Sequence, residues 1–275
     1  MSSQTLTTTH SDSSPNLSIS QLVRRHCRER LIVDPLHWTN RHLELLQCLF
    51  EAPSPAPPDS TANFCQDNLY FNFNQYRART LHCVSFFPGN DQEGARLGWV
   101  PPVAAFVDQS QIEDQRWKSL YAGPRRRHSK PTSMIFELRL KKITPQNPLR
   151  DPYIFALLIG VAQRQRHVVQ RKQAGAPVKM STFAAKLMFS VDDDEDLLHL
   201  FSANIPSSLL DSLEYPTTLP PSDLSAGSQA ILVRHMTLPY KPYKTFRNRL
   251  LLFLLPDTTT TVLGQDDGGI AVQCG

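Results

Sequence analysis

Apolar residues recur in the second half of the chain at spacings that distinguish strands from helices. Residues 133–143 carry apolar side chains at every second position, from 134 to 140, which predicts a half-buried strand. Asp151 and Pro152 then have the residue types of a helix N-cap and first helical turn. The helix that they begin runs to about residue 172, and its first half is apolar on all sides. We therefore expect this helix to be central and buried.

The pattern after this helix predicts a hairpin and three further elements. Residues 183–191 alternate as strands do, residues 197–205 are predicted as a second strand, and five consecutive acidic residues at 192–196 join them. A short helix at 206–215, a strand at 230–238 and a helix at 246–255 follow. From residue 133 to 238 the order is strand, helix, strand, strand, helix, strand, as in ferredoxin-like folds. The expected class is α+β, with a mixed or antiparallel sheet and additional N-terminal helices.

The first half of the chain is divided by proline. The apolar spacing predicts an amphipathic helix at 18–33, ended by Asp34-Pro35, and a second helix at 38–50. Four prolines between 52 and 62 are typical of a linker that joins neither a helix nor a sheet. Two short strands are expected within 68–87, and a helix at 109–121. The predicted organisation is a disordered 1–16, a helical 17–51, a Pro-rich linker 52–62, a core 64–255 and a disordered tail 256–275.

Composition narrows the class of protein and its expected location. The 275 residues carry a formal net charge of +4, too small to require a polyanionic partner. The five cysteines are odd in number and lack a Cys-x-x-Cys pair, so we expect free thiols, with neither a disulfide framework nor a zinc site. No apolar run approaches the roughly 18 residues of a membrane span, and residues 1–16 lack the apolar region of a secretory signal. We expect a cytoplasmic or nuclear protein without a membrane partner.

Charge is segregated along the chain. Sixteen Lys and Arg lie between Arg116 and Lys186, against only two acidic residues. This surplus is typical of a surface that follows phosphates, although ordinary solvated side chains are the alternative. Within it, Arg125, Arg126, Arg127 and Lys130 form a basic cluster that indicates an anion site or a nuclear import signal, or else an exposed loop.

Three residues loosely match the arrangement of an active site in a metal-dependent nuclease. Asp108 and Glu137 could hold Mg²⁺ at neighbouring strand ends, with Arg139 where such enzymes place a lysine. Arginine cannot transfer a proton in this way, and Glu137 and Arg139 could simply pair on one face of a strand. Because the motifs of phosphate loops, nucleophile elbows and zinc enzymes are also absent from the sequence, we assign no catalytic residue, cofactor or metal site.

Two stretches carry a family resemblance. Residues 151–159 (DPYIFALLI) and 239–247 (PYKPYKTFR) resemble uncharacterised proteins of filamentous fungi, over about residues 133–255. The resemblance implies no activity. The second stretch alternates aromatic and basic residues, which suits a partner groove or an anionic ligand, or else a strap into the last helix. Its candidate binding residues are Lys241, Tyr243 and Lys244.

These observations favour a non-enzymatic interaction or accessory module that binds a protein partner. The alternative is a nucleic-acid-binding or divergent nuclease-like protein that uses the basic segment 116–186. The placement of the basic residues distinguishes the two, because a nucleic-acid site requires them on one face.

Overall fold

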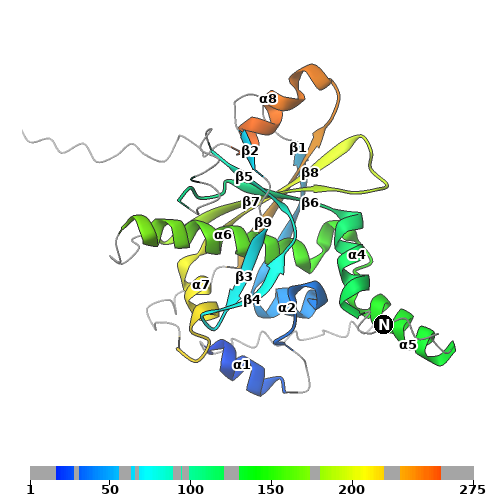
Figure 1. Cartoon of the computed structure of the whole chain (residues 1–275), viewed down its shortest axis with the longest axis vertical. Coiled ribbons are helices and arrows are strands. Elements are labelled where there is room, and N and C mark those ends of the chain that lie inside the picture. The colour runs from blue at the N-terminus through cyan, green and yellow to red at the C-terminus, as the bar shows by residue number, and fades with distance from the viewer. Residues whose placement is uncertain are drawn as a thin grey trace, which may run out of the picture.

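A mixed seven-stranded sheet organises the computed structural model of the chain (Figure 1). The structure describes residues 17–27, 31–55, 63–65, 68–88, 94, 99–120, 130–173, 180–219 and 230–254, with backbone alone for 54–55, 63–65 and 130–132. The strand order is β1-β9-β8-β7-β6-β5-β2. Its strands are β1 (Cys48–Pro55), β2 (Asn63–Cys65), β5 (Val84–Phe87), β6 (Ala104–Asp108), β7 (Thr182–Ser190), β8 (Leu197–Pro206) and β9 (Ile231–Pro239).

The sheet confirms the α+β class but not the ferredoxin-like arrangement. β1 pairs with β9 and β6 with β7 in parallel, whereas the other neighbouring strands are antiparallel. The predicted β7–β8 hairpin is present, with Phe189 opposite His199 next to the acidic turn. The predicted strand at 133–143 is absent, and β6 lies directly beside β7 instead. The helices α7 (Ser207–Glu214) and α8 (Tyr243–Leu254) lie where the sequence predicts them.

Helix α6 (Pro152–Lys172) forms the centre of the main core. The Asp151 carboxylate accepts a hydrogen bond from the Tyr153 amide, as the predicted N-cap requires. Every residue from Pro152 to Ala162 is buried, which confirms the expectation of a central helix. The reason is that α6 packs against the main sheet on one side and against a separate hairpin on the other.

That hairpin consists of β3 (Leu69–Phe73) and β4 (Tyr76–Leu81), and it forms a two-stranded sheet of its own. Asn74 and Gln75 both have positive φ, as a tight two-residue turn requires. At Gly160 of α6, a Cβ atom would lie 2.7 Å from Leu81 Cδ1, so glycine permits the hairpin to approach the helix closely. Two short strands were expected within 68–87; the third strand there, β5, joins the main sheet.

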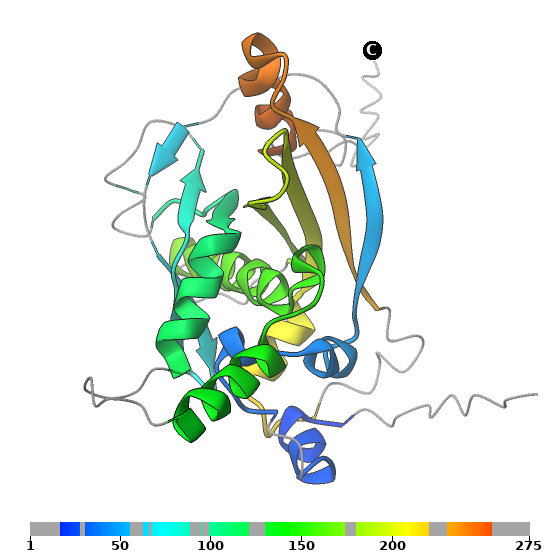
Figure 2. The same ribbon diagram turned by 90° about the vertical axis from the view of Figure 1, so that its right-hand side faces the viewer.

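The opposite face of the sheet has a second, smaller core. Helix α8 covers one end of this face, where it packs on apolar side chains of β7, β8 and β9. Figure 2 shows α8 at the end of the molecule toward which the parallel strands β1 and β9 both point.

The prediction of a strand at 133–143 is wrong. These residues belong to α5 (Lys130–Ile143), which follows α4 (Gln109–Leu120). The half-buried side chains of Phe136, Leu140 and Ile143 recur at steps of four and three, the helical period. Phe136 packs edge-on against Trp117 of α4 with ring centroids 5.8 Å apart. The alternation in sequence therefore came from exposed apolar residues, among them Leu138, rather than from a buried sheet face.

The N-terminal predictions also need correction. The first helix, α1 (Ile19–Arg25), is shorter than expected; a 3-10 turn η1 (Pro35–His37) and α2 (Asn40–Leu45) follow. Residues 48–55, predicted as helix and linker, form edge strand β1 instead. Proline is tolerated there because an edge strand needs no ladder bond on its outer side. The predicted disordered segments 1–16 and 256–275 lie outside the described residues.

Candidate functional site

An apolar groove of about 330 Å³ lies between α1, α2 and the β3–β4 hairpin. We call it the α1–hairpin groove. Figure 1 shows α1 at the end of the molecule, below α2 and the hairpin. Its volume lies at the lower end of the range of sites that hold small molecules or side chains of a partner. The groove is lined by Ile19, Leu22, Val23, Leu31, Ile32, Val33, Asp34, Pro35, Trp38, His42, Leu45, Leu46, Phe71, Phe73, Ala78, Arg79 and Leu213.

Helix α1 forms one wall of the groove. Ser18 and Gln21 make reciprocal side-chain hydrogen bonds with each other's backbone amides, and this capping box fixes the start of the helix. Ile19, Leu22 and Val23 recur at steps of three and one, so they share the helix face that lines the groove. None of α1 except its N-cap is fully buried. Its apolar face is therefore half-buried, and Ile19 packs against the main core.

The floor of the groove is aromatic and rigid. The buried Trp38 ring meets Phe71 of β3 edge-on, with centroids 5.4 Å apart, and stacks with the His42 ring of α2 at 6.0 Å. His42 is oriented by its Nδ1 atom, which accepts a hydrogen bond from the Thr39 amide at 2.9 Å. These contacts hold three elements in fixed positions around the groove.

One ion pair lies at the rim. The Arg79 Nε atom of β4 lies 2.8 Å from the Asp34 carboxylate. The same carboxylate accepts a hydrogen bond from the Leu36 amide, which places it at the start of η1. The side chain of Arg79 is 44% exposed, whereas that of Asp34 is 18% exposed. The guanidinium is thus the more accessible member of the pair, at the edge of an apolar site.

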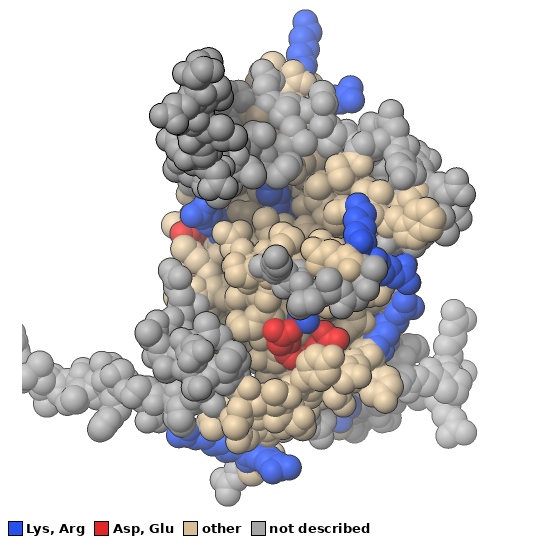
Figure 3. Space-filling view, turned by 90° about the vertical axis from the view of Figure 1, so that its left-hand side faces the viewer, with Lys and Arg blue, Asp and Glu red and all other residues tan. Residues whose placement is uncertain are grey.

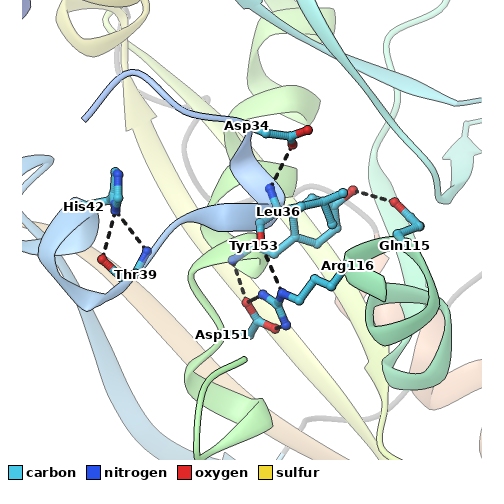
Figure 4. Close-up of polar contacts among 8 residues, drawn as sticks. All are labelled: Asp34, Leu36, Thr39, His42, Gln115, Arg116, Asp151 and Tyr153. Carbon is cyan, nitrogen blue, oxygen red and sulfur yellow. Dashed lines mark hydrogen bonds and ion pairs between the residues drawn. The ribbon is translucent and has the colours of Figure 1, made fainter. Parts of the chain in front are cut away.

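A buried polar network holds η1, the segment that carries the groove residue Pro35 (Figure 4). Arg116 of α4 donates two hydrogen bonds to the Asp151 carboxylate, at 2.7 and 2.5 Å, and a third to the Leu36 carbonyl at 3.0 Å. Its side chain is 2% exposed. The network joins α4, the start of α6 and η1. Since all three contacts are intramolecular and buried, we assign Arg116 and Asp151 a structural role.

The chemistry of the groove suits binding rather than bond cleavage. Asp34, His42 and Arg79 carry the titratable side chains among its lining residues, and each has a described partner. The His42 Nδ1 atom already accepts a hydrogen bond, and Asp34 is held between a backbone amide and a guanidinium. The remaining contacts that a ligand meets are predominantly apolar.

The structure does not assemble the nuclease-like layout. Asp108 ends β6, where its carboxylate accepts hydrogen bonds from the hydroxyls of Ser110 and Ser190. Burial opposes ionisation of Asp108, but these hydrogen bonds outweigh it and lower its pKa. Glu137 and Arg139 are exposed on helix α5, so neither lies at a strand end. Because they are two residues apart in a helix, their side chains point in different directions.

The candidate binding residues at 239–247 lie at the junction of β9 and α8. Lys241 forms an exposed ion pair with Asp196 at 3.1 Å, and the Tyr240 amide donates a hydrogen bond to the Asp196 carbonyl. The hydrogen bond and charge of Asp196 raise the pKa of Lys241. Tyr243 and Lys244 begin α8 with exposed side chains. This segment is therefore attached to the acidic turn, and a binding role for it stays a prediction.

The described basic residues of 116–186 do not gather on one face. Arg116 is buried, and Arg166 of α6 pairs with Asp211 and Glu214 at 2.5 and 3.4 Å. The basic residues of α5 and those at the end of α6 lie at opposite sides of the molecule (Figure 1). In Figure 3, blue groups lie at the top, the right side and the bottom of one face, with an acidic group near its centre. Arg125, Arg126 and Arg127 lie outside the described residues, as does the side chain of Lys130.

Comparison of the chain with known proteins identifies no relative. The chain matches no family model, no curated protein and no solved structure. The resemblance to fungal proteins therefore stays a prediction. Within the described residues, no helix is long and apolar enough to span a membrane, and no cluster of three His, Cys, Asp or Glu side chains could hold a metal ion.

Sequence reasoning missed the groove. Its walls come from the N-terminal helices, the β3–β4 hairpin and Leu213, which are separated by up to almost two hundred residues. The available signal was the apolar spacing of Ile19, Leu22 and Val23, which identifies a helix face but not what lies opposite it.

Proposed function

We propose that this chain is a non-enzymatic interaction module whose α1–hairpin groove binds apolar side chains of a protein partner. The observation that carries the proposal is the groove itself, an apolar site with the accessible guanidinium of Arg79 at its rim. Ile32 lines it and is 61% exposed. Clustered exposed apolar side chains are typical of protein-binding surfaces.

The proposal has an energetic basis. Burial of one large aliphatic side chain contributes about 1.5–3 kcal/mol, so three anchors contribute about 4.5–9 kcal/mol, part of which the cost of association offsets. The rigid floor of Trp38 and Phe71 limits the conformational entropy that binding would remove.

The test is selection of peptides on the intact protein. A random twelve-residue library displayed on phage is selected against the immobilised chain, and affinities of the enriched peptides are measured by fluorescence polarisation. We expect Ile32→Glu to weaken these peptides about tenfold or more, because a carboxylate then enters the apolar contact. Leu138→Glu is the matched control, since Leu138 is 67% exposed on α5, outside the groove. Peptides that bind both variants and the parent equally would refute the proposal.

A further inference from the structure

Strand β4 presents an open backbone edge beside the groove. Within the described residues, β4 pairs with β3 alone. The other edge of β3 is occupied, because Gln163 of α6 makes two hydrogen bonds to the Asn72 backbone, and the Asn74 amide donates to the Leu213 carbonyl. Four consecutive β4 residues, Tyr76 to Arg79, are exposed. The unpaired donors and acceptors of such an edge can accept another strand.

The edges of the main sheet are less suitable for strand addition. β1 carries Pro53 and Pro55, which lack the amide donors that a ladder needs. β2, at the opposite edge, has only three residues. β4 has six residues and no proline, and its pairing with β3 shifts register once, at Ala78. It is therefore the edge best able to pair with a peptide in the described part of the chain.

The edge and the groove form one continuous surface. Ala78 and Arg79 belong to β4 and also line the groove. In a strand, alternate side chains point to opposite faces, so a peptide paired with β4 would direct every second side chain into the groove. Backbone bonds along the edge and apolar side chains in the groove are the two components of recognition by strand addition.

Charge identifies the chemistry of the occupant. β4 contains Arg77 and Arg79 and no acidic residue. The Arg77 guanidinium is held against the Tyr70 ring, 3.3 Å from its centroid, so its position is fixed. A second copy of β4 would place arginines close to arginines, which opposes self-association. Because Arg79 is paired with Asp34 and lines the groove, Arg77 is the charge that an acidic strand would meet favourably.

We propose that the protein binds an extended partner peptide in which apolar and acidic residues alternate, by adding it as a strand to the free edge of β4. Every second side chain of the peptide enters the α1–hairpin groove, and its carboxylates, on the other face of the peptide, lie near Arg77. This inference rests on the proposed function, because it names the conformation and charge of the partner that the groove accepts.

The test uses two synthetic eight-residue peptides, one alternating Val and Glu and the other alternating Val and Lys, with the full chain at low salt. We expect the Val–Glu peptide to bind and the Val–Lys peptide to bind at least about tenfold more weakly. Arg77→Glu, which breaks no described ion pair, should weaken the Val–Glu peptide about threefold or more, as expected for exposed charge pairs. Arg139→Glu on α5 is the matched control and should have no effect.

Single N-methylation along the Val–Glu peptide tests the conformation. Because only every second amide of a strand faces its neighbour, methylation at alternate positions should abolish binding while the positions between tolerate it. Failure of both peptides to bind, equal binding of the two, or a methylation scan without alternation would overturn the inference. Peptides from the phage library that depend on Ile32 but show no alternation would leave the proposed function standing, so the two failures are distinguishable.

Discussion

At the scale of residues, the buried charge of Arg116 is the most demanding feature. A guanidinium in the core is tolerated because Asp151 and the Leu36 carbonyl accept its hydrogen bonds. Removal of one partner leaves the other charge buried and unpaired, which costs far more than the net gain from forming the pair.

Asp151→Ala should therefore lower the free energy of unfolding by about 3–5 kcal/mol, since it removes both the partner of Arg116 and the N-cap of α6. Urea denaturation followed by circular dichroism measures this change. Asp114→Ala removes an exposed ion pair with Lys118 and should cost less than about 1 kcal/mol. Equal effects of the two substitutions would contradict a structural role for the Arg116 network.

A buried histidine pair gives the second prediction at this scale. His199 Nδ1 and His235 Nε2 lie 3.1 Å apart between β8 and β9, and His199 Nε2 lies 3.3 Å from the Asp194 carboxylate. Burial, together with the charge of His199, lowers the pKa of His235 to about 4. Since an unfolded histidine titrates near 6.5, the unfolded chain binds a proton between pH 6.5 and 4 that His235 in the folded chain does not bind.

Stability should consequently be full above pH 6.5 and fall as the pH decreases toward 4, with His235 contributing a loss of about 2 kcal/mol at pH 4.5. Urea midpoints at pH 7 and pH 4.5 give the difference. His235→Gln should reduce this pH dependence by about that amount. A variant with the pH dependence of the parent would show that His235 is protonated in the folded state.

At the scale of elements, α6 depends on being enclosed by the sheet and the hairpin. Leu158 has no exposed surface in this position. Leu158→Ala should lower the free energy of unfolding by about 2–5 kcal/mol, through lost burial and a residual cavity. Leu138→Ala on α5 is the control and should change stability by no more than about 0.5 kcal/mol. Thermal or urea unfolding compares them, and an unaffected Leu158→Ala protein would mean that the α6 core is not formed as described.

Elements were predictable from the sequence where local signals and tertiary packing agree. The Asp151-Pro152 cap, the alternating strand β7, the apolar strand β8 and the acidic turn between the two strands each carry a local pattern. Helix α5 was not predictable from alternation, because its apolar residues are largely exposed and no sheet face selects them. β1 was missed because prolines mark it as a linker, while its pairing with β9 involves residues more than 170 positions away.

At the scale of the whole molecule, the candidate site depends on packing that no local pattern reveals. The groove forms where α1, η1 and α2 meet the hairpin, and the side chain that anchors η1, Arg116, belongs to a segment that by sequence looked like part of a nucleic-acid surface. Its burial removes it from that surface. A count of charges along the chain cannot separate a buried ion pair from a solvated basic face.

Dispersal of the described basic residues predicts weak binding to nucleic acids. We expect duplex or single-stranded DNA to bind only at low salt and to dissociate at about 150 mM, as non-specific phosphate contacts do. Filter binding or fluorescence polarisation across a salt series tests this, with charge reversal of Arg125, Arg126 and Arg127 as the variant. Micromolar binding that persists at 150 mM salt and is lost in the variant would favour the nucleic-acid alternative.

The pairing of β1 with β9 has a consequence for biosynthesis. Cys48 of β1 faces Ile231 of β9, so the partner strand is translated about 180 residues after it. At a synthesis rate of about 5–20 residues per second, β1 waits roughly 10–40 seconds outside the ribosome with its apolar Leu49 and Phe50 unpaired. We expect Pro53 and Pro55 to limit its association with other nascent chains during that time, because a strand that contains prolines is a poor template for another strand. The prolines that make β1 resemble a linker in the sequence are therefore expected to reduce aggregation of the chain during its synthesis.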